Sequence, residues 1–392
     1  MSHSHSHSRL RSTSAGRSRW HLVALGTGVV LIAVGVAVAV GVAVVGHSSG
    51  KVSASPTTSP AGKPAASNLP LNVVAVTPAD GASGVPSDAT ITVVFSEALS
   101  THSPVPTLSP AVPGTWEQAT PTTLAFVAAA PLVPSSSETV TVPAGTGGML
   151  STAGRTLTQG ATVHFGVAPG TTLRLQQLLA QLGYLPVSFT PAGPLSAPQE
   201  LAQPQEGTFA WRFAEPASLM TQWTPGTSDV LTKGAVMRFQ DKHAMTTDGV
   251  AGPAVWTALL ADDSAGAIDT DAYNYVFVSK SLPQRTTVYS NGATAYSTLA
   301  NTGVAAAQTA SGTFPVFEHL TVTTMRGTNP DGSKYVDPGI PWVSYFNGGD
   351  ALHGFVRSSY GFPQSDGCVE MPPANAGVVF PYTPIGTLVT VS

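Results

Sequence analysis

Hydrophobic and polar positions follow four successive patterns along the 392-residue chain. A long uncharged apolar run occupies residues 22–46. Residues 71–169 alternate apolar and polar positions with a period of two, whereas residues 170–262 show helical spacing. Strand-like segments return in residues 271–392. The patterns predict a multidomain, mainly β protein with one small helical module.

The N-terminal segment predicts a membrane topology. Four arginines lie within residues 1–21, ahead of the apolar run: Arg9, Arg11, Arg17 and Arg19. The run is longer than the roughly 18 residues of a spanning helix, and positive charge before it places the N-terminus in the cytoplasm. A cleaved signal peptide is the alternative, but its apolar core is shorter, about 7–15 residues. We therefore expect a cytoplasmic tail, a transmembrane anchor at 22–46 and a flexible Ser/Pro/Thr-rich linker at 47–70.

Residues 71–169 are predicted to form a β-sandwich. Ile91, Val93 and Phe95 occupy every second position, and the apolar residues of 163–167 do the same. Turn signals such as Pro78-Ala79-Asp80-Gly81 separate the short strands. The stretch from Val76 to Ser96 resembles bacterial immunoglobulin-like domains, and we assign it no chemistry.

Residues 170–262 are predicted to hold three helices. The first is marked by leucines at i, i+3, i+4 and i+7, which are Leu175, Leu178, Leu179 and Leu182. Gly183 then ends it. A second helix runs through residues 235–239, and a third begins at Pro253, because proline suits a first helical turn. The pattern resembles the three-helix peptidoglycan-binding module. It departs from that module in a long insertion, where Trp211 and Trp223 either stack on sugar rings or pack inside the fold.

Charge and cysteine content limit the classes of function. Charged residues make up 10% of the chain and the net charge is −4, whereas about 25% charged residues is typical. No basic cluster follows the first twenty residues, which excludes nucleic-acid binding on electrostatic grounds. The single cysteine cannot form an internal disulfide. Outside the membrane, such a thiol is either reactive or an incidental buried residue.

That cysteine lies in a segment suited to nucleophilic catalysis. His353 precedes Cys368 by 15 positions, a separation that two neighbouring strands joined by a loop can close. An imidazole within hydrogen-bond reach activates a thiol. Gly367 lets the backbone approach a substrate closely, so we expect its N–H near the oxyanion.

The motifs His353-Gly354 and Ser365-Asp366-Gly367-Cys368 give a specific resemblance. Residues 271–392 resemble the catalytic domain of the L,D-transpeptidase (YkuD-type) family. The resemblance implies Cys368 as nucleophile, His353 as general base and acid, and the Gly354 carbonyl as the group that orients His353. It implies no metal and no cofactor.

Four further residues are predicted to bind substrate: Ser365, Asp366, Tyr345 and Trp342. Core packing is the alternative for the two aromatic residues. The chain also departs from the family where Glu370 replaces a common arginine. Carboxylates at positions 366 and 370 would raise the pKa of the thiol unless their side chains point away.

The implied reaction is acyl transfer between peptidoglycan stem peptides. Cys368 attacks a tetrapeptide donor, D-Ala leaves, and an amine of a neighbouring stem forms a 3→3 cross-link. Expected partners are stem peptides and glycan, the membrane through the single N-terminal helix, and carbapenem-type inhibitors. The catalytic domain is then extracytoplasmic, in the cell-wall space.

Several alternatives are less well supported. With water as acceptor the same site is an L,D-carboxypeptidase, and a non-catalytic wall anchor is the non-enzyme alternative. A sortase needs an arginine after the cysteine, and none follows Cys368. Papain-like peptidases place cysteine before histidine, the reverse of this order. A metal site built from the nearby acidic residues, His353 and Cys368 matches no zinc spacing.

Overall fold

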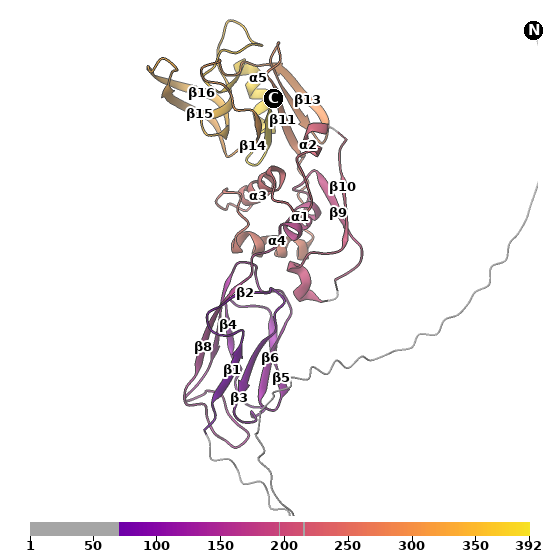
Figure 1. The fold of residues 1–392 in the computed structure, drawn as a ribbon, viewed down its shortest axis with the longest axis vertical. Coiled ribbons are helices and arrows are strands. Elements are labelled where there is room, and N and C mark those ends of the chain that lie inside the picture. The colour runs from indigo at the N-terminus through magenta and orange to yellow at the C-terminus, as the bar shows by residue number, and fades with distance from the viewer. Residues whose placement is uncertain (1–69, 196, 215) are drawn as a thin grey trace, which may run out of the picture. The chain divides into compact units, whose positions relative to one another are not determined.

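The computed structural model describes residues 70–195, 197–214 and 216–392 (Figure 1). The predicted tail, the predicted anchor and nearly all of the predicted linker lie outside these residues. Within them, no helix is both long enough and apolar enough to cross a membrane. The described chain is mainly β, and most of its helices belong to residues 172–265.

Residues 73–167 form the predicted β-sandwich. One sheet has the order β1-β3-β6-β5 and the other β2-β8-β7-β4. Ile91, Val93 and Phe95 of β3 are all buried, so the period-two pattern marks the core face of the strand. The strands are β1 (Val73–Thr77), β2 (Ala82–Val85), β3 (Ile91–Phe95), β4 (Thr107–Ser109), β5 (Gly114–Thr120), β6 (Thr123–Ala128), β7 (Ser137–Val142) and β8 (Ala161–Val167).

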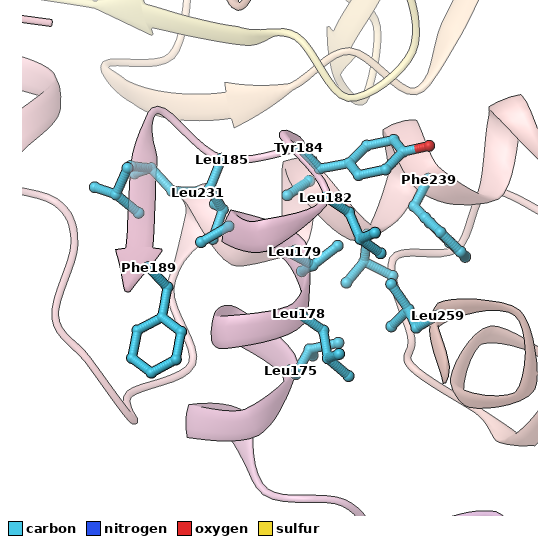
Figure 2. Packing of buried hydrophobic residues seen from close by; sticks show 14 of the residues in the cluster. Leu175, Leu178, Leu179, Leu182, Tyr184, Leu185, Phe189, Leu231, Phe239 and Leu259 are labelled. Carbon is cyan, nitrogen blue, oxygen red and sulfur yellow. The ribbon is translucent and has the colours of Figure 1, made fainter. Parts of the chain in front are cut away.

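The three predicted helices are present as α1 (Thr172–Gln181), α3 (Val230–Lys242) and α4 (Pro253–Ala265). Thr171 caps α1 by accepting a hydrogen bond from the Arg174 N–H, which satisfies one of the unpaired donors of the first turn. Gly183 follows the helix with φ +86°, a conformation that glycine adopts without strain. The leucines of α1 pack against Phe239 of α3 and Leu259 of α4 (Figure 2).

The insertion between the first two helices folds as part of the same module. It contains an antiparallel hairpin of β9 (Val187–Pro191) and β10 (Gly207–Trp211), with η1 (Pro198–Ala202) and the short α2 (Ala217–Met220). Trp211 and Trp223 meet edge to face at 6.0 Å, and both pack against the module core. Of the two predicted roles, the structure favours packing.

Residues 274–391 form a domain with two sheets. The first has the order β13-β12-β11-β19-β14, and the second has the order β15-β16-β17-β18. The C-terminal strand β19 lies between β11, to which it is parallel, and β14, to which it is antiparallel. The strands are β11 (Asn274–Ser279), β12 (Arg285–Ser290), β13 (Ala293–Leu299), β14 (Gly312–Pro315), β15 (Glu318–Thr328), β16 (Lys334–Asn347), β17 (Asp350–Gly354), β18 (Val369–Met371) and β19 (Leu388–Val391).

The predicted short helix near the C-terminus is α5 (Pro373–Val379), followed by η2 (Phe380–Tyr382). Valines from β11 and β19 and Ala376 and Val379 of α5 share one buried cluster with Leu352 and Val369. The last two belong to β17 and β18, the strands that carry the candidate site. Packing against this core therefore fixes both strands that position the reactive side chains.

Candidate active site

The parallel pairing of β17 with β18 brings the predicted thiol and imidazole to one cavity. Leu352 pairs with Val369 and His353 with Glu370, so Cys368, the residue immediately before β18, lies beside the strand that carries the histidine. Both side chains line a cavity of about 300 Å³. A separation of 15 positions in sequence is thus closed by two adjacent strands.

His353 is buried and held in one tautomer. Its Nδ1 lies 3.1 Å from the Gly354 carbonyl oxygen. A carbonyl can only accept, so Nδ1 carries the hydrogen and Nε2 keeps its lone pair. Burial lowers the pKa of His353, and the hydrogen bond to Gly354 opposes this only in part. The side chain is therefore a neutral base near pH 7, in the orientation predicted for Gly354.

Cys368 is half-buried and rests as a thiol. Its Sγ lies 3.6 Å from the Gly349 carbonyl oxygen. Burial raises the pKa of Cys368 to about 12; a hydrogen bond from the Ala351 backbone opposes this, and the charges of Asp350, Glu370 and Asp366 add to it. Among the described residues, no hydrogen bond joins Sγ to the imidazole. The resting pair is neutral, so the thiol must lose its proton as it attacks.

The loop before the cysteine uses its own polar groups internally. The Gly367 N–H donates to Ser365 Oγ at 3.3 Å, and Ser365 Oγ donates to the Cys368 carbonyl at 2.5 Å. Ser365 lines the cavity, but its hydroxyl hydrogen and the Gly367 N–H are both used within the loop. The roles of Ser365 in substrate binding and of Gly367 near the oxyanion stay predictions. Gly367 also matters sterically. Its φ is +118°, and a Cβ there would lie 2.6 Å from Asp350 Oδ1.

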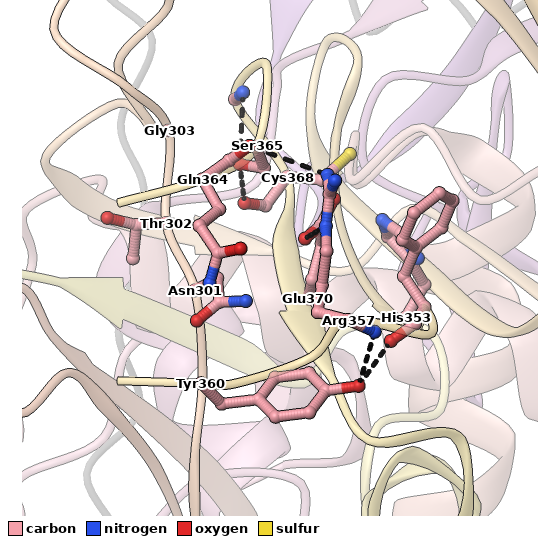
Figure 3. A network of polar contacts seen from close by, with 12 residues as sticks. Asn301, Thr302, Gly303, His353, Arg357, Tyr360, Gln364, Ser365, Cys368 and Glu370 are labelled. Carbon is pink, nitrogen blue, oxygen red and sulfur yellow. Dashed lines mark hydrogen bonds and ion pairs between the residues drawn. The ribbon is translucent and has the colours of Figure 1, made fainter. Parts of the chain in front are cut away.

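The two carboxylates that flank the thiol in sequence differ in environment. Asp366 is exposed and lines the cavity. Glu370 is buried and accepts two hydrogen bonds from Arg357, each 2.8 Å long (Figure 3). No motif in the sequence marks Arg357, which follows β17 in an irregular loop. Its cation compensates the charge that Glu370 places near the thiol.

The two predicted aromatic residues lie apart. Tyr345 stacks on Phe317 at 6.2 Å and packs in the small cluster that includes Cys368. Trp342 instead packs on Phe380 at 5.4 Å and does not line the cavity. Its φ of +59° breaks the period-two alternation of β16, so its side chain leaves the cavity face. Tyr345 does not line this cavity either, so the substrate-binding roles of both aromatic residues stay predictions.

The β15–β16 hairpin supplies a wall of the cavity that sequence reasoning missed. Its lining residues are Met325, Asn329, Tyr335, Asp337 and Ile340. They come from two long strands whose pairing alone brings them beside the thiol. Within the described residues, no group of three His, Cys, Asp or Glu side chains has an arrangement that could hold a metal.

Comparison with known families decides the identity of this domain. Residues 273–391 match the model of the L,D-transpeptidase (YkuD) catalytic domain. The C-terminal domain belongs to the L,D-transpeptidase family. Residues 67–167 match a bacterial Ig-like domain and residues 221–259 a peptidoglycan binding domain. The L,D-transpeptidase domain therefore follows two modules, both of which were predicted from sequence resemblance.

Solved structures of L,D-transpeptidases are also similar to this chain. One from Mycobacterium smegmatis is 13% identical, with 83% of this chain and 100% of that chain covered and a TM-score of 0.28. L,D-transpeptidase 3 from Mycobacterium tuberculosis, solved with a faropenem-derived adduct, is 11% identical, with coverage of 82% and 97% and a TM-score of 0.28. The catalytic domain of the E. faecium L,D-transpeptidase is 26% identical, with 30% of this chain and 96% of that chain covered and a TM-score of 0.28. No curated protein matches the sequence significantly.

Proposed function

We propose that this protein is a peptidoglycan L,D-transpeptidase that forms 3→3 cross-links through a thioester on Cys368. The observation that carries the proposal is the hydrogen bond from His353 Nδ1 to the Gly354 carbonyl. It leaves the basic Nε2 of a neutral imidazole available in the cavity that also holds the thiol. An imidazole so oriented can take the thiol proton as the carbon–sulfur bond forms.

The proposed reaction has two halves. In the first, Sγ of Cys368 attacks the carbonyl carbon of the third, L-configured residue of a tetrapeptide stem, and Nε2 of His353 takes the thiol proton. The tetrahedral intermediate collapses, D-Ala leaves with that proton on its amine, and a thioester remains. In the second half, an amine of a neighbouring stem attacks the thioester and loses a proton to His353. Cys368 then leaves and recovers the proton as a thiol.

We also propose that the enzyme works in the cell-wall space, on a single-pass membrane anchor with a cytoplasmic N-terminus. The apolar run and the preceding arginines support the anchor, and the Ig-like and peptidoglycan-binding matches support the wall location. Carbapenems should acylate Cys368, since they present a strained carbonyl to the same nucleophile.

Muropeptide analysis tests the proposal. The full chain is incubated with purified disaccharide-tetrapeptides, and the products are separated and weighed by mass spectrometry. We expect 3→3 dimers and free D-Ala, both lost in Cys368→Ala. Tripeptides with D-Ala but without dimers would show L,D-carboxypeptidase activity instead. Dimers in equal yield from Cys368→Ala would contradict the nucleophile assignment.

A further inference from the structure

The cavity that holds the thiol contains one preorganised cation, Arg357. Five polar or aromatic contacts hold it in place. Nε and Nη2 donate to the Glu370 carboxylate, Nη2 also lies 3.4 Å from the Gln364 carbonyl, the Arg357 backbone N–H donates to Tyr360, and the guanidinium lies 4.6 Å from the Phe355 ring centre (Figure 3). A side chain fixed this firmly has already lost the rotamer freedom that binding a ligand would otherwise cost.

The guanidinium retains capacity to bind. Nη1 makes no hydrogen bond to any described part of the chain, and about a third of the side chain is exposed, whereas Glu370 is buried. Arg357 is the only lysine or arginine among the described residues that line the cavity. Guanidinium groups bind carboxylates with paired, charge-assisted hydrogen bonds. The geometry therefore offers one fixed place for an anion beside the reactive pair.

The other charges around the cavity restrict where an anion can bind. Asp337 and Asp366 line it as well, so a carboxylate that enters is repelled from those two positions. Glu370 lines it too and is already paired with Nε and Nη2 of Arg357, so the position left for an anion is the free Nη1 side of the guanidinium. A net-negative cavity with one cation thus selects a ligand by the position of its carboxylate as well as by its charge.

We propose that Arg357 binds the terminal carboxylate of the donor stem peptide and so selects stems that end one residue after the scissile bond. This inference rests on the proposed function. The carboxylate of a terminal D-Ala lies one residue beyond that bond, at most about 3.6 Å of extended chain. A longer stem has an amide at that place and cannot form the same pair. Arg357 then determines specificity, while Cys368 and His353 carry out the chemistry.

The test compares two ligands in binding, without turnover. In the Cys368→Ala background, calorimetry measures the affinity of a disaccharide-tetrapeptide and of the same ligand with a C-terminal carboxamide. We expect amidation to weaken binding at least tenfold when Arg357 is present. With Arg357→Gln added, the two ligands should bind equally. Amidation that weakens binding by the same factor in both backgrounds, or in neither, overturns the proposal.

Two further variants control for structure. Arg357→Gln leaves the buried Glu370 unpaired, so the double variant Arg357→Gln/Glu370→Gln removes both charges and should show the same loss of discrimination. Arg285→Gln removes a cation of the same domain that does not line the cavity, and it should keep the tenfold effect. If wild type forms no dimers but the carboxylate ligand still binds more tightly than the carboxamide, the proposed function is contradicted and the role of Arg357 stands. If dimers form but the two ligands bind equally, only the role of Arg357 is contradicted.

Discussion

Two histidines of the C-terminal domain show what makes an imidazole useful in this fold. His353 on β17 and His319 on β15 both have pKa values lowered by burial, and each contacts one backbone carbonyl. His319 uses Nε2 for the Phe380 carbonyl at 3.1 Å and stacks on that ring at 3.7 Å. His353 uses Nδ1 and lines the cavity with the thiol. His319 is half-buried and His353 is buried, so a lowered pKa and one carbonyl contact accompany a packing residue in one place and a base in the other.

Replacement of each histidine should separate these two roles. His353→Ala removes the base, so kcat/KM for dimer formation should fall by about 10³-fold, within the usual range for general base catalysis. His319→Ala should leave kcat/KM within a few-fold, while it lowers the free energy of unfolding by about 1 kcal/mol. Muropeptide kinetics and denaturant titration measure the two effects. Equal activity losses in the two variants would contradict the comparison.

The loop before Cys368 gives the next largest effect. Gly367→Ala should cost about 1–3 kcal/mol of local strain, because φ is +118° and the new methyl group would meet Asp350. The strain falls on the residue before the nucleophile, so kcat should drop about tenfold or more. Gly349→Ala is the matched control, since a Cβ there meets nothing within 4 Å. A Gly367→Ala enzyme as active as Gly349→Ala would show that the loop tolerates displacement.

The pH dependence should show a neutral base and a neutral thiol. The lowered pKa of His353 means that protonation is disfavoured in the folded state. Activity should therefore persist below pH 6.5, and stability should fall as pH drops through the folded pKa, since the unfolded chain takes up that proton first. The thiol pKa of about 12 predicts that alkylation of Cys368 by iodoacetamide still accelerates above pH 9. A rate that levels off below pH 9 would contradict the burial of the thiol.

The smallest effect should come from Asp366→Asn. This exposed carboxylate has the smallest effect of the three charges that raise the pKa of Cys368, and solvent screens it. The alkylation profile should move to slightly lower pH, by less than the change in a matched Asp350→Asn variant. A larger change for Asp366→Asn than for Asp350→Asn would contradict the prediction that Asp350 has the stronger effect on the pKa of Cys368.

Local patterns predicted much of the fold, and pairing between distant strands explains what they missed. The leucine spacing of α1 and the alternation of β3 depend only on residues close in sequence, so the helix and the strand could be predicted. The short motifs that contain His353 and Cys368 could be recognised because each is a run of consecutive residues. Arg357 and the residues of the β15–β16 hairpin reach the cavity only through tertiary contacts. The left-handed backbone at Trp342 likewise cannot be inferred from a period-two pattern, which assumes regular strand geometry.

The most direct measurement is intact-mass spectrometry of the acyl-enzyme. Full-length protein is mixed with a disaccharide-tetrapeptide, quenched in acid and weighed, alongside Cys368→Ala, His353→Ala and His319→Ala. A thioester on Cys368 predicts a mass increase equal to the disaccharide-tetrapeptide minus D-Ala in wild type and His319→Ala. The adduct should appear slowly in His353→Ala and not at all in Cys368→Ala. No adduct on wild type under conditions where dimers form, or an equal adduct on Cys368→Ala, would contradict catalysis by the Cys368–His353 pair.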